Sequence, residues 1–178
     1  MKIFIASLAS AFFLCASQSF AQQIIVNTGG SVNCVNAPGE NGFEISNYSL
    51  GGTDPSRPAG TGTRKPNLSN LNIVKGFDTC SEQLIQAFLG AKSLPTVTLT
   101  QYSAGVGKSL PPFPFLTITL TNALISNYQL AGQNPAAPQE QVSFAYTAVC
   151  VSSTAQTPSG APGETTKVCY DAVLNKIM

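Results

Sequence analysis

Cysteine is the residue type with the most chemistry available in this chain, and histidine is absent. The sequence holds five cysteines and no histidine. Without histidine, Ser-His-Asp and Cys-His catalysis are excluded, together with most metal sites. No two cysteines have the Cys-x-x-Cys spacing of a zinc site, and the acidic residues are scattered singly. The sequence therefore predicts no catalytic residue, no metal site and no cofactor.

The first 21 residues have the pattern of an export signal. Lys2 gives a positive start, residues 3–16 are almost wholly apolar, and Ser19 and Ala21 place small residues where a signal peptidase cleaves. The apolar run is too short to span a bilayer comfortably, so we expect no stable membrane insertion. We expect a signal peptide over 1–21, one domain over 22–178, and a periplasmic or extracellular (secreted) protein.

Removal of this segment takes Cys15 away and leaves an even number of cysteines, which in an exported chain is typical of disulfides. The four that remain are Cys34, Cys80, Cys150 and Cys169. Four cysteines allow three pairings, and the sequence alone does not choose between them. We favour Cys150 with Cys169, because a hairpin turn at 159–160 would place them opposite each other. That choice leaves Cys34 with Cys80.

Charge is sparse and balanced. Nine basic residues stand against eight acidic ones, and loss of Lys2 with the leader leaves eight of each. There is no basic cluster of the kind that binds nucleic acid, so we expect no nucleic-acid partner.

A long polar segment, Gly51 to Pro66, is rich in Gly, Pro and Thr. Its charged residues are Asp54, Arg57, Arg64 and Lys65. Loops of this length are commonly functional or disordered. Two interpretations stay open: a solvated loop, or an arm that docks on a neighbouring subunit.

Alternating apolar and polar residues predict strands with one buried face. Three such runs lie at 95–102, 113–124 and 141–151, and the short breaks between them indicate an antiparallel meander. In the second run Leu116, Ile118 and Leu120 share one face. Further strands are expected at 23–27, 43–50, 68–77 and 166–174, with breaks at 126–138 and 152–164.

One short helix is expected between 79 and 90. Thr79 and Glu82 have capping-box spacing, and Gly90 suits a left-handed C-terminal position. The apolar stripe of this helix consists of Leu84, Ile85, Phe88 and Leu89. On the preceding strand, Leu71, Ile73 and Phe77 are expected on one face. The fold class is mainly β, with about seven strands closed into an antiparallel barrel or a sandwich.

The order of these segments resembles the Hcp (haemolysin-coregulated protein) family of type VI secretion. The residues that fall on the family's positions are Leu116, Ile118, Leu120, Leu124, Ser126, Glu140, Val142, Phe144 and Ala145. The resemblance covers 43–151, with a weaker continuation to the end. It implies an antiparallel β-barrel of the Hcp or phage tail tube type with one side helix. It also implies a homohexameric ring, stacking of rings into a tube, and small effectors carried in the lumen.

On this resemblance, segment 51–66 matches the loop through which one ring reaches the next. The chain departs from the family in its signal peptide, in its disulfide-type cysteines, and in having Cys169-Tyr170 where a Gly-Trp is common. Two functions therefore stay open. The first is a self-assembling ring or tube protein, with itself and a secreted effector or secretion-apparatus protein as partners. The second is a monomeric exported binding module stapled by disulfides.

Overall fold

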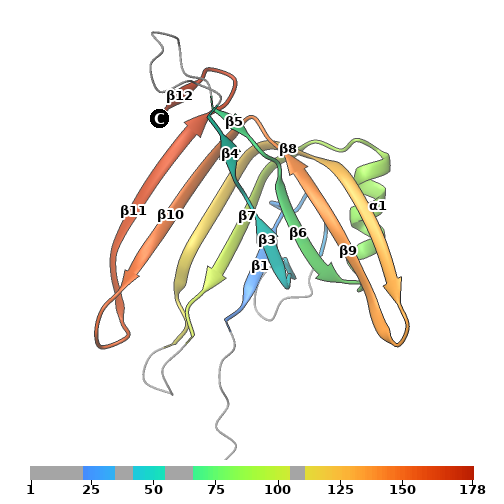
Figure 1. Ribbon diagram of the computed structural model, residues 1–178, viewed down its shortest axis with the longest axis horizontal. Coiled ribbons are helices and arrows are strands. Elements are labelled where there is room, and N and C mark those ends of the chain that lie inside the picture. Colours follow the sequence, from blue (N-terminus) through green and yellow to red (C-terminus); the bar gives the residue numbers. More distant parts are fainter. Residues whose placement is uncertain (1–21, 35–41, 55–65, 105–110) are drawn as a thin grey trace, which may run out of the picture.

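A computed structural model describes residues 22–34, 42–54, 66–104 and 111–178. The predicted signal peptide at 1–21, and Arg57, Arg64 and Lys65, lie outside the described residues. One helix, α1 (Ser81–Leu89), accompanies twelve strands within the described part (Figure 1). The strands are β1 (Ile24–Asn27), β2 (Phe43–Glu44), β3 (Asn47–Ser49), β4 (Gly52–Thr53), β5 (Asn67–Leu68), β6 (Leu71–Gly76), β7 (Leu94–Tyr102), β8 (Pro114–Gln133), β9 (Ala136–Ala145), β10 (Ala148–Gln156), β11 (Pro162–Asp171) and β12 (Lys176–Ile177).

Antiparallel pairing leads from strand to strand around a barrel. β8 pairs with β7, β7 with β1, and β1 with β2, while on the other side β8 pairs with β9, β9 with β6, and β6 with β3. β2 and β3 are two parts of one bent segment. At the bend, the Ile45 amide donates to the Ile24 carbonyl and the Ser46 amide donates to the Val74 carbonyl. The circuit thus closes through continuity of the chain at this segment.

The long strand β8 takes part in both halves of the barrel because it bends. Its residues up to Ala123 pair with β7 and β10, and its residues from Leu124 pair with β9. Asn122 sits at the change with a φ of 48°, in the left-handed region that asparagine tolerates better than most residues. At the same corner the Thr147 amide donates to the Thr121 carbonyl, so the turn between β9 and β10 follows the bend.

Several of the expected strand boundaries were wrong. The segment 126–138, expected as a break, belongs mostly to β8 and β9, whose hairpin turns between Gln133 and Ala136. The run 141–151 is divided between β9 and β10. Segment 152–164 is largely strand, because β10 reaches Gln156 and β11 begins at Pro162. Polar composition concealed these strands, since both of their faces lie at or near the surface.

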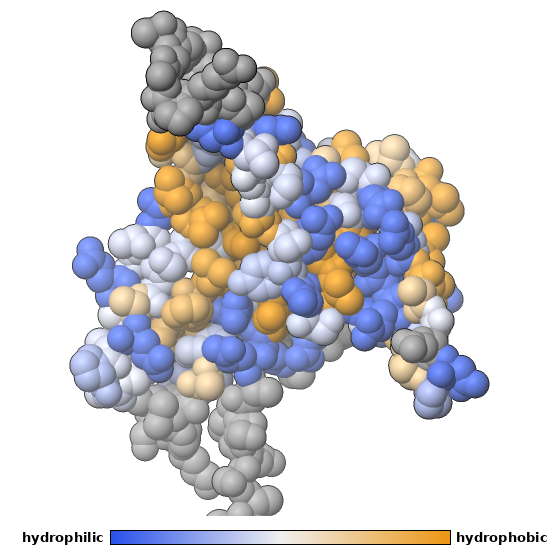
Figure 2. Space-filling model, viewed as in Figure 1, coloured by the Kyte–Doolittle hydropathy of each residue, from blue (hydrophilic) through white to orange (hydrophobic). Residues whose placement is uncertain are grey.

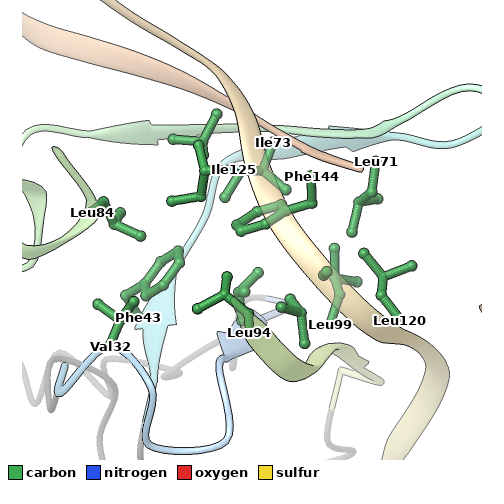
Figure 3. Close-up of a cluster of buried hydrophobic side chains, with 14 of the residues drawn as sticks. Val32, Phe43, Leu71, Ile73, Leu84, Leu94, Leu99, Leu120, Ile125 and Phe144 are labelled. Carbon is green, nitrogen blue, oxygen red and sulfur yellow. The ribbon is translucent and has the colours of Figure 1, made fainter. Parts of the chain in front are cut away.

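The core fills the barrel interior with residues from most of its strands and from the helix (Figure 3). Leu116, Ile118 and Leu120 lie on one face as expected, with Ile118 and Leu120 buried. The largest wholly buried apolar side chains are Phe43, Phe144, Leu71, Ile73, Leu84, Leu94, Leu99 and Leu120. Burial of side chains of this size contributes about 1.5–3 kcal/mol each.

The helix differs from expectation at both ends. Its N-cap is Cys80 rather than Thr79, and the Cys80 side chain makes no capping bond. Instead the Cys80 amide donates to the Asp78 carboxylate, while the Asp78 amide donates to Ser81 Oγ. At the C-terminal end Gly90 has a φ of −83°, and Ala91 takes the left-handed conformation. Of the predicted stripe, Leu84 is buried, whereas Leu89 is exposed.

Strand β6 carries an unexpected buried charge. Leu71 and Ile73 point into the core as predicted, but Lys75 is the next buried residue on that face, and Phe77 is 45% exposed. The Lys75 ammonium forms an ion pair with Glu140 on β9 and another, at 2.8 Å, with Asp78. It also donates to Ser81 Oγ and lies over the Phe43 ring.

Further bonds join this buried charge cluster to the helix and to β8. Ser81 Oγ donates to the Glu140 carboxylate at 2.8 Å, and the Tyr128 hydroxyl donates to its other oxygen. Burial raises the pKa of Tyr128, with a further increase from the hydrogen bond and the negative charge of Glu140. Lys75, Asp78, Ser81, Tyr128 and Glu140 therefore join β6, β8, β9 and the start of α1.

We predict strongly non-additive effects of mutation in this cluster. Lys75→Met should lower the free energy of unfolding by about 3–5 kcal/mol, because it leaves the Glu140 carboxylate buried without its cation. Lys75→Met combined with Glu140→Leu should lose less than the single variant does. Urea denaturation measures both, with the exposed Lys167→Met as a control. A double variant as unstable as the sum of its two single variants would contradict the assignment.

Candidate assembly surface

The β10–β11 hairpin extends beyond the barrel and forms an arm, which we define as residues 148–171. In Figure 1 it lies at the side of the molecule opposite α1. β11 pairs with β10 along most of its length and with the short β12 only near its end. Residues 162–168 are exposed on both faces of the strand. This part of β11 is therefore held mainly by its pairing with β10.

One face of the arm continues the core face of the barrel into solvent. Across the sheet, Ile118 on β8 is opposite Val151 on β10, which is opposite Val168 on β11. Directly opposed residues in an antiparallel sheet share a face, so these three form one row. Exposure rises along this row from 3% at Ile118 to 56% at Val168. The barrel's own core leaves the outer part of this apolar face uncovered.

The outer edge of β11 carries backbone groups that no described strand pairs with. β12 pairs only with Tyr170 and Asp171, and the Met178 amide extends the contact to the Cys169 carbonyl. Residues 162–168 are left as an edge within the described structure. An open edge of this kind is a template for pairing with another chain. Lys167 lies on this strand, and a charged side chain is one of the devices that limit unspecific pairing.

The opposite face of the same sheet is lined by hydroxyl groups. Thr98, Thr100, Thr117, Thr119, Ser152 and Thr154 lie on it. Cys150 and Cys169 are directly opposite each other on this face, and a disulfide joins them. The face is uncharged over β7, β8 and β10, so water satisfies it and it requires no apolar cover.

A second group of exposed apolar residues belongs to elements on the other side of the molecule. Leu89, at the end of α1, is 76% exposed, and Leu130 on β8 is 52% exposed. Phe77 follows β6. Figure 2 shows apolar surface both over the sheet that carries the arm and over the region of α1. We call Phe77, Leu89 and Leu130, which are exposed on these separate elements, the helix-side apolar residues. The molecule thus has different apolar surfaces on opposite sides.

The remaining predicted site residues are placed as follows. Asp54 is exposed just after β4, and the other charged residues of its segment lie outside the described residues. Cys34 and Cys80 are both buried, and the structure holds them as thiols rather than as the expected disulfide. The Cys34 thiol points at the Cys80 carbonyl, with 3.9 Å between Sγ and O.

Among the described residues, no group of three or more His, Cys, Asp or Glu side chains is arranged to hold a metal ion. No helix within the described ranges has the length and apolar character needed to cross a membrane.

Several solved structures have the same fold as this chain. A solved type six secretion system protein shares 22% identity, covers 89% of this chain and all of its own, and has a TM-score of 0.76. Hcp1 from Salmonella typhimurium shares 20% identity, with coverage of 88% and 99% and a TM-score of 0.70. A type VI secretion system effector from Yersinia pestis has 17% identity, coverage of 83% and 98%, and a TM-score of 0.63. These structures share the fold of this chain.

The amino-acid sequence itself identifies the family. The family model described as "Type VI secretion system effector, Hcp" matches residues 28–152, which is well over half of the chain. The chain belongs to the Hcp family. No curated protein matches it. The match ends within β10, so the outer half of that strand and all of β11 and β12 lie beyond the matched residues.

The exposure of β11 predicts that the disulfide limits fraying of the arm. Replacing Cys150 and Cys169 by serine should raise amide hydrogen exchange in 162–168 by roughly tenfold, because only the pairing with β10 then holds this part of the strand. Exchange in β6 and β9 should stay unchanged. Hydrogen exchange with mass spectrometry measures this, with Thr165→Ala as a control on the same face. Unchanged exchange in β11 would show that pairing with β10 alone holds the arm.

Proposed function

We propose that this protein is a structural subunit that assembles with copies of itself into a homohexameric ring, and that rings of this kind stack into a tube. The main support is the two-sided distribution of exposed apolar surface. The arm presents an apolar row and an open strand edge on one side, and the helix-side apolar residues are exposed on the other. Two different surfaces on opposite sides favour head-to-tail contacts, which close into a ring when the rotation permits.

The chemistry of the two arm faces supports this orientation. The face that includes Val168 and Tyr170 gains by leaving water, at roughly 25 cal/mol per Å² of apolar surface buried. The hydroxyl face gains nothing comparable, so it stays open to water in the assembly. Membership of the Hcp family agrees with a tube component. A secreted effector or secretion-apparatus protein is the partner class that this family implies.

The same proposal includes export through the signal at 1–21, to the periplasm or the extracellular medium. Support comes from the apolar leader and from the even number of cysteines that follow it. It also includes a contact role for segment 51–66, with Asp54, Arg57, Arg64 and Lys65 reaching a neighbouring ring. Its support is that the segment includes β4, which pairs with β5 in a small ladder separate from the barrel.

We predict that the mass of the exported chain, residues 22–178, rises with concentration to that of a hexamer. Val168→Lys should weaken this association by roughly tenfold or more, because it places a charge in the apolar row that must lose water. Thr165→Lys is the matched control, since it adds the same charge to the opposite face of the same strand. Size exclusion with light scattering gives the mass, and negative-stain microscopy shows the shape of the particles.

A monomer at every concentration would contradict self-assembly and would favour the second function, a monomeric exported binding module. If the two lysine variants weaken association equally, self-assembly still stands. The result would then contradict the proposal that the apolar face of the arm forms the contact.

A further inference from the structure

The two cysteines outside the arm meet at the point where the N-terminal segment reaches the helix. Cys34 is 4% exposed and Cys80 is 2% exposed. They are 46 residues apart in sequence, and the Cys34 thiol lies 3.9 Å from the Cys80 carbonyl oxygen. The two buried residues therefore lie next to each other, between the N-terminal segment and the start of α1. Neighbouring thiols are the arrangement from which a disulfide forms when the separation of the two Cα atoms permits.

The surroundings give a bond at this place a structural consequence. Cys80 is the N-cap of α1, and its amide donates to Asp78 Oδ1, the oxygen that also accepts from Lys75. Cys34 follows a hydrogen-bonded loop, in which Thr28 Oγ1 both accepts from the Val32 amide and donates to the Val32 carbonyl. A bond between the two sulfur atoms would tie this segment to the start of the helix beside the buried charge cluster.

We propose that Cys34 and Cys80 form a second thiol–disulfide site, which a disulfide-type oxidant converts from the thiol pair seen here into a bond that locks segment 28–34 onto α1. One cysteine thiolate attacks the oxidant's disulfide, which breaks that S–S bond and releases one thiol. The second cysteine then attacks the mixed disulfide and releases the other thiol. The protein loses two hydrogen atoms, with their two electrons, and the oxidant is reduced to two thiols.

Both thiols are shielded from solvent in the folded chain. A pocket of about 480 Å³ lies between residues 30–33 and the helix residues Gln83, Gln86 and Ala87, but neither cysteine lines it. Burial raises the pKa of Cys34 and also that of Cys80, so few thiolates form in the folded state. Oxidation should accordingly be fastest while the chain folds.

The test of this site starts from the reduced, unfolded chain of residues 22–178. This chain is refolded in a buffer of reduced and oxidised glutathione, unfolded again in the presence of an alkylating maleimide, and digested with trypsin. Cleavage at lysine and arginine separates all four cysteines, so each disulfide is seen as a linked pair of peptides. We expect peptide 22–64 linked to peptide 76–92, in addition to peptide 109–167 linked to peptide 168–176.

Variants identify the bond. Cys34→Ser should leave Cys80 alkylated, and Cys150→Ser with Cys169→Ser should leave the 22–64 to 76–92 link intact. Oxidised wild type should unfold at a temperature roughly 5–15 °C above Cys34→Ser/Cys80→Ser, because the bond closes a long loop. The proposal is overturned if Cys34 and Cys80 stay alkylated in samples in which Cys150 and Cys169 are linked. None of these readouts depends on self-assembly, so the outcome stands apart from that of the ring proposal.

Discussion

The buried ammonium group of Lys75 is the constraint on which the arrangement of the barrel and its helix depends. An ammonium group inside a protein must be paired and hydrogen-bonded, because the loss of its hydration costs several kcal/mol. Here the neutralising groups come from β9, through Glu140, and from the start of the helix, through Asp78. Tyr128 on β8 donates to the same Glu140 carboxylate. Misplacement of any one of these elements would leave a buried charge without its partner.

This requirement also explains why the helix begins where it does. Asp78 and Ser81 exchange bonds at the helix start while both also contact Lys75. The helix cap and the buried charge cluster thus share the side chains of Asp78 and Ser81. With Cys80 as the N-cap, Ser81 is the first helical residue, and its Oγ accepts from Lys75 and donates to Glu140. The tertiary contact therefore overrides the local capping preference.

The bend in β8 determines which part of the sheet extends beyond the barrel core. Because β8 changes partners near Asn122, its first half remains free to pair with β10 on the side away from β7, and the arm grows from there. The barrel core covers the face of the arm close to β8 and leaves the outer part bare. A sheet that extends past its own core is incomplete as a monomer, which is the physical basis for expecting a second copy against it.

Much of the fold follows from short-range patterns. Alternation in β7 and in the first half of β8 determines which side chains face inward, since the side-chain period of a strand is two. The hairpin that places Cys150 opposite Cys169 was expected from the turn residues between them, and the register of β10 and β11 agrees with it. The Hcp family was also recognisable from the order of these strands, and the family model matches residues 28–152.

The parts that could not be predicted depend on contacts distant in sequence. Lys75 alternates with Leu71 and Ile73, but sequence analysis predicts an exposed lysine unless its carboxylate partner is known. Here the partner is Glu140, which lies 65 residues away in the sequence. The outer parts of β10 and β11, within residues 152–164, show no hydrophobic period, because their ladder partners rather than a core define them. By itself the sequence determined the faces of the regularly alternating strands, the helix at 81–89 and the family, since these depend on residues close in sequence. Only the tertiary structure decided which charges are buried, where β8 bends and which apolar surfaces stay uncovered, because each of these depends on neighbours supplied by the rest of the chain.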